Sequence, residues 1–299
     1  MDKPAKYVFI GNREYVLKEM IRLRLPIQRV WVMENSFLHH RLMQDPFIDY
    51  TVAGNKKQLL EELKDTCFDI LVSNGCKYIL PITLLKKAKM RDDILFINVH
   101  PSYLPDLKGM DPINGACLFN RAGGATCHCM DDGIDTGTAI SRIKIPMSDD
   151  IDAGLLFQLS FKAEVDAFRK AFAARFIPQE QGETIKEPIY YTISADEMIF
   201  NGSKGVDYLL RQARAFGYKS KGVCIRIDNK NYKYFDAETI KNQYVIDFFA
   251  DIPELQIGIA FERSIIFKLA GEIVRLNQLT IDNSACLEGH FIQEYVQEQ

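Results

Sequence analysis

The chain has 299 residues, 47% of them hydrophobic, which is typical of a globular protein with one large or two ordinary domains. Its formal net charge of −3 excludes a general attraction to nucleic acid or to an anionic membrane. No apolar stretch is long enough to span a membrane and the first residues lack the apolar core of a signal peptide, so we expect a cytoplasmic protein without membrane partners.

The first half of the chain alternates strand and helix patterns. Short apolar runs predict strands at residues 7–10, 30–33, 68–72 and 94–99. Helical spacing of apolar residues predicts helices over residues 14–25, 56–65 and 82–89. Because short strands separated by helices form parallel sheets, we predict an α/β fold with a Rossmann-like, doubly wound sheet.

The turn after the first strand contains Gly11, Asn12 and Arg13. It supplies only one of the three glycines of a dinucleotide-binding turn, which disfavours a nicotinamide cofactor. Backbone amides at the start of the next helix, with Arg13 beside them, suit a substrate phosphate. An ordinary strand-to-helix turn is the alternative.

The second half of the chain changes character. Residues 125–130 and 139–145 predict strands, and 151–172 a long helix. The polar segment 178–188, with two prolines, predicts a boundary between a catalytic domain (1–185) and a C-terminal domain (186–299). Beyond it we predict a small β-rich, barrel-like domain. The segment 196–216 carries one helix, and residues 228–231 form a turn. The predicted strands are 222–227, 232–235, 257–261, 264–269 and 272–276.

The most informative residues are Asn98 and His100, at the end of the strand 94–99, where open α/β sheets place their chemistry. They lie two residues apart, so both side chains face one way, and both can donate to an oxygen that gains negative charge. Asp135, in the turn 131–137, can accept a proton, and its charge would favour a protonated His100. A structural histidine and a turn aspartate bonded to backbone amides are the alternatives.

The motif Asn98-Val99-His100, the loop Pro101-Ser102-Tyr103-Leu104-Pro105 and the turn Asp135-Thr136-Gly137 resemble those of the folate-dependent formyltransferases, in the same order. Tyr103 stands where that family usually has leucine. The segments 73–81 and 107–115 are more similar to the sugar N-formyltransferases than to the methionyl-tRNA enzymes. This resemblance covers roughly residues 66 to 145, and it implies that Asn98, His100 and Asp135 are catalytic.

The resemblance also implies that formyl-tetrahydrofolate is the formyl donor, with no metal. Apolar residues of a loop would line its pterin slot and a second segment would close it; plain packing at a helix start is the alternative for Ile79 and Leu80. The expected folate-binding residues are Lys77, Tyr78, Ile79, Leu80, Met130, Asp132 and Ile134. The expected substrate-binding residues are Gly11, Asn12, Arg13, Lys77, Ser102 and Gly109.

Seven cysteines, an odd number scattered through apolar runs, predict reduced thiols rather than a disulfide framework. The tripeptide Cys127-His128-Cys129 lies in a predicted strand, so its two thiols face one way and the imidazole the other. A zinc site usually needs wider spacing and a second ligand pair, so we predict core thiols here.

The function that the resemblance favours is formylation of the amino group of a nucleotide-linked, dTDP-type deoxy-amino sugar, for lipopolysaccharide or other surface glycans. Methionyl-tRNA is the alternative acceptor, but it requires an electropositive surface. Residues 35–55 hold Arg41 as their one Lys or Arg, and residues 191–299 hold 12 basic and 15 acidic residues. A non-catalytic folate- or nucleotide-binding protein is the alternative of another class. A homodimer is expected, since a partner would cover strand edges.

Overall fold

The computed structural model of the chain describes residues 4–45, 47–178, 185–219, 221–228, 230–282 and 286–287. Two compact units are present. The first comprises Met1–Pro112, Ala122–Pro146 and Gln158–Tyr191, and the second Ile113–Arg121, Met147–Phe157 and Thr192–Gln299. The linker predicted at 178–188 and the turn predicted at 228–231 lie partly outside the described residues. The predicted domain boundary after residue 185 therefore stays a prediction.

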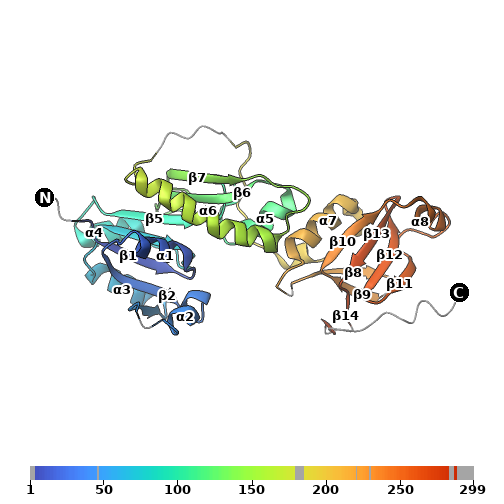
Figure 1. Cartoon of the computed structure of the whole chain (residues 1–299), viewed down its shortest axis with the longest axis horizontal. Helices are drawn as coiled ribbons and strands as arrows, with labels where there is room; N and C mark the ends of the chain where they lie inside the picture. Colours follow the sequence, from blue (N-terminus) through green and yellow to red (C-terminus); the bar gives the residue numbers. More distant parts are fainter. Residues whose placement is uncertain are drawn as a thin grey trace. The chain divides into compact units, whose positions relative to one another are not determined.

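The first unit contains a seven-stranded sheet in the order β3-β2-β1-β4-β5-β6-β7 (Figure 1). The strands from β1 to β5 are parallel, as predicted, whereas β6 is antiparallel to β5 and β7 to β6. This antiparallel edge was not predicted, because a hydrophobic pattern carries no strand direction. The strands are β1 (Tyr7–Gly11), β2 (Ile27–Met33), β3 (Thr51–Ala53), β4 (Ile70–Asn74), β5 (Leu95–His100), β6 (Gly123–Cys129) and β7 (Ala139–Ile145).

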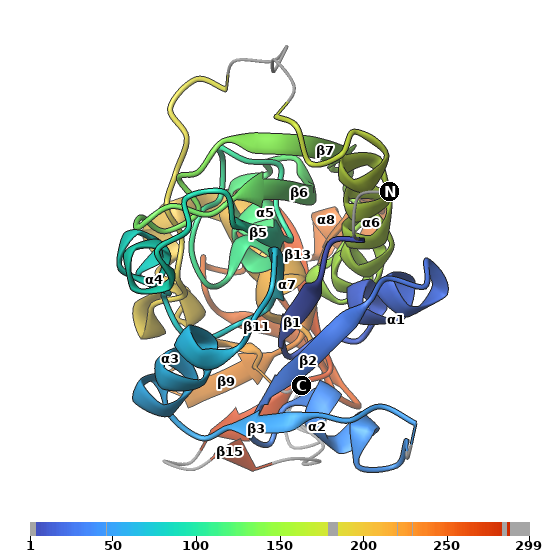
Figure 2. The same cartoon turned by 90° about the vertical axis from the view of Figure 1, so that its left-hand side faces the viewer.

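Helices cover both faces of this sheet (Figure 2). One face packs on α1 (Tyr15–Arg22), α2 (Phe37–Leu42) and α6 (Ala153–Ala173), and the other on α3 (Lys56–Asp65) and α4 (Ile82–Lys89). A strand covered on both sides needs apolar residues at successive positions, which is why β1 and β4 are buried throughout.

The second unit contains two antiparallel four-stranded sheets, in the orders β10-β13-β12-β11 and β15-β14-β9-β8. The antiparallel, β-rich character predicted for the C-terminal region is thus confirmed. Its elements are α5 (Pro112–Phe119), α7 (Gly205–Phe216), β8 (Val223–Ile227), β9 (Lys230–Tyr234), β10 (Asp236–Ile240), α8 (Gln243–Phe248), β11 (Ile257–Phe261), β12 (Ser264–Leu269), β13 (Glu272–Asn277), β14 (Thr280–Asp282) and β15 (Cys286–Leu287).

The single helix predicted over residues 196–216 is wrong in its first half. That segment forms two short 3-10 turns, Ala195–Met198 and Gly202–Lys204, before α7 begins. The Asn201 side chain accepts from the Ser203 N–H, and Gly205 has φ 70°, so local turn chemistry interrupts the helix. In the part of the chain that the structure describes, no helix has both the length and the hydrophobicity of a membrane span.

Candidate active site

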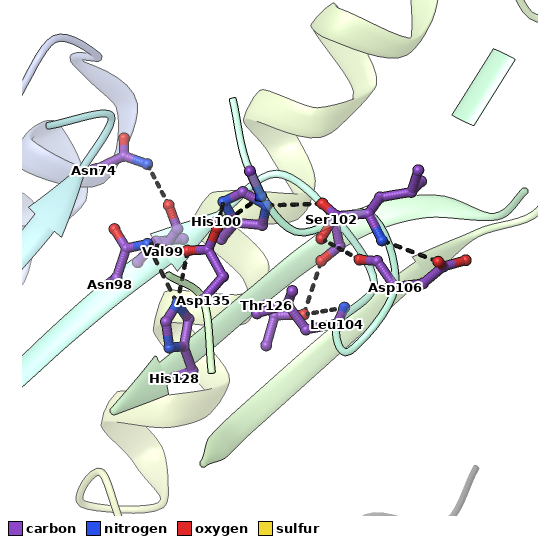
Figure 3. A network of polar contacts seen from close by, with 12 residues as sticks. Asn74, Asn98, Val99, His100, Ser102, Leu104, Asp106, Thr126, His128 and Asp135 are labelled. Atoms are coloured by element: carbon purple, nitrogen blue, oxygen red, sulfur yellow. Dashed lines mark hydrogen bonds and ion pairs between the residues drawn. The ribbon is translucent and has the colours of Figure 1, made fainter. Parts of the chain in front are cut away.

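The carboxyl end of β5 brings two of the predicted catalytic residues together with a third polar side chain. Asn98 and His100 lie on one side of β5, and the strand register places His128 of β6 directly opposite Asn98. Asp135 reaches them from the loop between β6 and β7. Figure 3 shows these side chains pointing toward one another.

Asn98 links His128 to Asp135. Its Nδ2 atom lies 3.2 Å from His128 Nε2 and donates to Asp135 Oδ1 at 3.3 Å. His128 Nδ1 lies 2.8 Å from the carbonyl oxygen of Cys129, which can only accept. We therefore assign the ring proton to Nδ1 and let Nε2 accept from Asn98. The two N–H groups of the Asn98 amide are both used in this arrangement.

His100 is held between a carbonyl and a carboxylate. Its Nε2 lies 3.2 Å from Leu107 O, and its Nδ1 lies 3.5 Å from Asp135 Oδ2. Burial lowers the pKa of His100, and this effect outweighs the opposing charge of Asp135. Burial therefore works against the protonated form of His100 that the sequence analysis expects. Nε2 donates to Leu107 O, which can only accept, and Nδ1 faces the Asp135 carboxylate.

Asp135 has a left-handed backbone conformation, with φ 51°. Aspartate adopts this conformation more readily than most residues. Its Oδ2 accepts from the Gly109 N–H at 3.0 Å. Burial opposes ionisation of this carboxyl group, but the charge of His100 when that ring is protonated, together with the Gly109 N–H, outweighs burial and lowers the pKa of Asp135 to about 2. Asp135 is therefore a carboxylate at neutral pH.

The loop after β5 is fixed by hydrogen bonds from β6 and from the loop itself (Figure 3). Thr126 donates to Ser102 O at 2.8 Å and accepts from Leu104 N at 3.0 Å. Ser102 donates to Asp106 O at 2.9 Å. These bonds hold the Leu107 carbonyl against His100, which fixes the orientation of the imidazole.

A cavity of about 310 Å³ lies in front of these residues, within the first unit. All three predicted catalytic residues line it, as does His128. Most of the expected folate- and substrate-binding residues line it as well: Lys77, Tyr78, Ile79, Leu80, Met130, Ile134, Asn12, Arg13 and Gly109. Their roles in binding stay predictions.

Three of the expected binding residues do not line this cavity. Asp132 accepts from the Thr83 N–H at 3.1 Å and so caps the start of α4. Ser102 is fully buried, with its hydroxyl group bonded inside its own loop. Gly11 packs against β4, where a Cβ would lie 2.1 Å from Asn74 O. Asp132, Ser102 and Gly11 therefore lie outside the lining of this cavity, and their roles in binding stay predictions.

His128 is the polar residue that sequence reasoning missed. Alternation along β6 was predicted to separate it from Cys127 and Cys129, and the structure confirms this: both cysteines contribute to the hydrophobic core. The sequence pattern that could have identified His128 is strand alternation, which turns this imidazole to the face opposite the two core thiols. The six cysteines with described side chains are free thiols. No group of three His, Cys, Asp or Glu residues suited to a metal ion occurs within the described ranges.

Residues 41–171 match the family model described as formyl transferase. The methionyl-tRNA formyltransferase of Caldanaerobacter subterraneus subsp. tengcongensis is 32% identical over 149 residues, which are 48% of this chain and 46% of that protein. The chain thus spans about half or less of the length of the curated relatives it matches.

Two solved structures are similar over nearly the whole chain. The sugar 3N-formyl transferase WlaRD, determined in the presence of dTDP and 5-N-formyl-THF, superposes with a TM-score of 0.66 at 20% identity, over 92% of this chain and 98% of that one. The N-formyltransferase from Helicobacter canadensis, in complex with folinic acid and dTDP-3-aminofucose, gives a TM-score of 0.67 at 18% identity, over 92% and 99%. With the family match, these confirm the resemblance found in the sequence: residues 41–171 are similar to formyl transferases, and the chain has the fold of the sugar N-formyltransferase structures.

Proposed function

We propose that this protein transfers the formyl group of formyl-tetrahydrofolate to the amino group of a nucleotide-linked, dTDP-type deoxy-amino sugar, in the cytoplasm, for surface glycan biosynthesis. The observation that carries the proposal is the convergence of Asn98, His100 and Asp135 at one cavity, in a formyl transferase domain. Separately, each residue has a structural explanation. Together they provide donors for a developing negative charge and an acceptor for a proton.

The cavity suits a flat heteroaromatic group such as a pterin. Its volume of about 310 Å³ lies in the range of small-molecule sites. Ile79 and Ile134 line it and expose 51% and 39% of their surface, which is apolar area that a flat ligand would cover. Met130 adds an adaptable apolar contact. These residues therefore fit the folate donor, which supplies the formyl group when bound.

Asp135 is the residue we assign to the proton of the attacking amine. With a pKa of about 2 it is ionised at neutral pH and accepts a proton only as the new carbon–nitrogen bond makes the amine acidic. The carboxylate is aimed by the Gly109 N–H and by Asn98. Its two oxygens are thus held in one orientation before any substrate arrives.

Asn98 is the residue we assign to the formyl oxygen. Its amide donates to His128 and Asp135 in the ligand-free protein, so one of these N–H groups turns toward the ligand during reaction. A donor of this kind contributes about 3 kcal/mol of transition-state stabilisation at comparable sites. His100 keeps the Asp135 side of the site in place through its contact with that carboxylate.

Two similar structures support a sugar acceptor. WlaRD, a sugar 3N-formyl transferase, and the Helicobacter canadensis enzyme, in complex with dTDP-3-aminofucose, each align with 92% of this chain. The C-terminal residues 191–299 carry more acidic than basic side chains, which opposes binding of a tRNA. The sequence relatives make methionyl-tRNA the second candidate acceptor.

The test is release of tetrahydrofolate from formyl-tetrahydrofolate, followed by absorbance. The purified protein is assayed with dTDP-, UDP- and GDP-linked amino sugars and, in parallel, with methionyl-tRNA. Turnover on a nucleotide sugar alone is expected. Turnover on methionyl-tRNA alone would overturn the acceptor, and folate binding without turnover on any amine would point to a binding protein.

A further inference from the structure

Glu164 of α6 is a buried acid that the proposed reaction does not use. Its side chain is fully buried, and its Oε1 accepts a hydrogen bond from Arg13 Nη1. Arg13 lies in the turn between β1 and α1, exposes 18% of its side chain and lines the cavity. Among the residues that the structure describes, Glu164 is the one hydrogen-bond partner of this guanidinium group. The carboxyl group therefore determines where Arg13 points.

Glu164 also lies next to Asn74, at the carboxyl end of β4. The Asn74 side chain lies within hydrogen-bonding reach of the carboxyl group, and Asn74 Nδ2 donates to Val99 O at 3.0 Å. Val99 separates the two catalytic residues of β5. The Oε2 of Glu164 and the Oδ1 of Asn74 are both buried acceptors without a hydrogen-bond partner among the described residues. Burial raises the pKa of Glu164, against the charge of Arg13 and the hydrogen bond with Asn74, which lower it.

The surroundings leave this pair little freedom. Phe161, three residues before Glu164 on α6, stacks on Tyr15 at the start of α1, with ring centroids 4.7 Å apart. Positions three apart share a face of a helix. The Phe161–Tyr15 stack and the Glu164–Arg13 contact therefore both hold α6 against the segment that joins β1 to α1. Arg13 immediately precedes the N-terminal region of α1, whose free N–H groups favour an anion.

We propose that Glu164 is a positioning residue, which holds the Arg13 guanidinium at the cavity wall to bind the diphosphate of the nucleotide-linked substrate. This inference rests on the proposed function, because it requires a substrate with a diphosphate. An arginine has five N–H donors, and the Glu164 bond leaves donors for phosphate oxygens. A guanidinium that is already oriented loses less conformational freedom when the phosphate binds, so the affinity is higher.

Two substitutions at one position test the inference. Glu164→Leu removes the acceptor, whereas Glu164→Gln keeps an acceptor for Arg13 and supplies an N–H for Asn74. Binding of dTDP, UDP and GDP alone is measured by calorimetry, and KM and kcat are measured with the nucleotide sugar that is turned over. We expect Glu164→Leu to weaken nucleotide binding and raise KM about tenfold, with kcat within about twofold, and Glu164→Gln to restore most of the loss. If the Leu variant does not fold, Glu164→Asp, with its shorter side chain, replaces it with an expected several-fold loss.

The matched control is Glu19→Leu. Glu19 is also a buried carboxylate between α1 and α6, where it accepts from Arg22 and Arg169, but it does not line the cavity. We expect this control to lose stability and to keep its nucleotide affinity. An equal loss of affinity in both Leu variants would overturn the inference, as would a fall in kcat with unchanged affinity.

A double-mutant cycle completes the test. If Glu164 acts through Arg13, Arg13→Gln combined with Glu164→Leu should bind nucleotide no more weakly than Arg13→Gln alone. Additive losses would overturn the inference. Because nucleotide binding is measured without turnover, the outcome is separable from the proposed function. Absence of turnover by the wild-type protein on every nucleotide sugar would contradict the function, whereas unchanged nucleotide affinity in an active Glu164→Leu variant would contradict only the inference.

Discussion

At the scale of single residues, the site depends on which atoms of its polar side chains are already hydrogen-bonded. The His128 ring accepts from Asn98 and is itself fixed by the Cys129 carbonyl. Buried polar groups that lose a partner cost about 1–3 kcal/mol each. The orientation of Asn98 thus depends on a residue that need not touch either substrate.

The first prediction concerns His128. Replacement by alanine removes the acceptor for the Asn98 amide, so we expect kcat to fall about tenfold. Replacement by glutamine keeps an acceptor oxygen and should retain more activity. Steady-state assays of both variants check this order, and full activity of His128→Ala would show that Asn98 needs no such partner.

The second prediction concerns Asp135. Asp135→Asn keeps the shape of the side chain but cannot accept the proton of the amine, so we expect kcat to fall by about 10²- to 10⁴-fold with the fold intact. The control is Asp132→Ala, which removes the cap of α4 and should cost about 1 kcal/mol of stability with little change in kcat. The assay and a thermal melt together separate the two effects. Activity of Asp135→Asn within a few-fold of the wild type would exclude Asp135 as the proton acceptor.

The third prediction follows from the pKa of Asp135, about 2 in the folded protein against an ordinary value of 3.8. The unfolded chain takes up this proton at higher pH, so the stabilisation is present above pH 4 and is lost as the pH falls through 2. The difference amounts to about 2 kcal/mol. Urea unfolding of the wild type and of Asp135→Asn at several acid pH values measures it. Parallel stability curves for the two proteins would contradict the assigned pKa.

At the scale of elements, strands β5 and β6 and the loops that follow them place the reactive groups. The fourth prediction concerns Gly109, which has φ 105° and donates to Asp135; a Cβ there would lie 2.6 Å from Tyr191 O. Gly109→Ala should therefore displace the loop, destabilise the protein by more than about 1 kcal/mol and reduce kcat. Gly271, with φ 81° and no atom within 4 Å of its would-be Cβ, is the matched control. Gly271→Ala should lower stability without changing kcat. Equal kcat values for the two variants would show that the Gly109 loop does not contribute to catalysis.

The scale of elements also shows which secondary structure was predictable. The bounds of α3, α4 and β7 coincide with those predicted, because each has a clear period and a defined end. The helix expected within residues 196–216 is present but begins only at Gly205, because turn chemistry in the preceding residues overrides the hydrophobic period. Short elements such as α2 and β3 have too few residues to show a period.

At the scale of the whole molecule, exposed apolar side chains in the second unit bear on its assembly. Tyr244 and Phe248 of α8 and Phe261 of β11 are exposed. The fifth prediction is the homodimer expected from the sequence, since a second copy would cover such side chains and the strand edges. Sedimentation velocity should give twice the chain mass of 34.3 kDa. A single species of one chain mass across the concentration range would rule the dimer out.

The sequence alone determined the fold class and the three residues of the predicted catalytic set, because strand periodicity and motif order are local properties of the chain. The tertiary structure decided what these residues do to one another. Strand register placed His128 opposite Asn98, burial lowered the pKa of His100, and packing joined Glu164 to Arg13 across 151 positions of sequence. Register, burial and long-range pairing depend on how distant segments meet, and no pattern within a single segment contains that information.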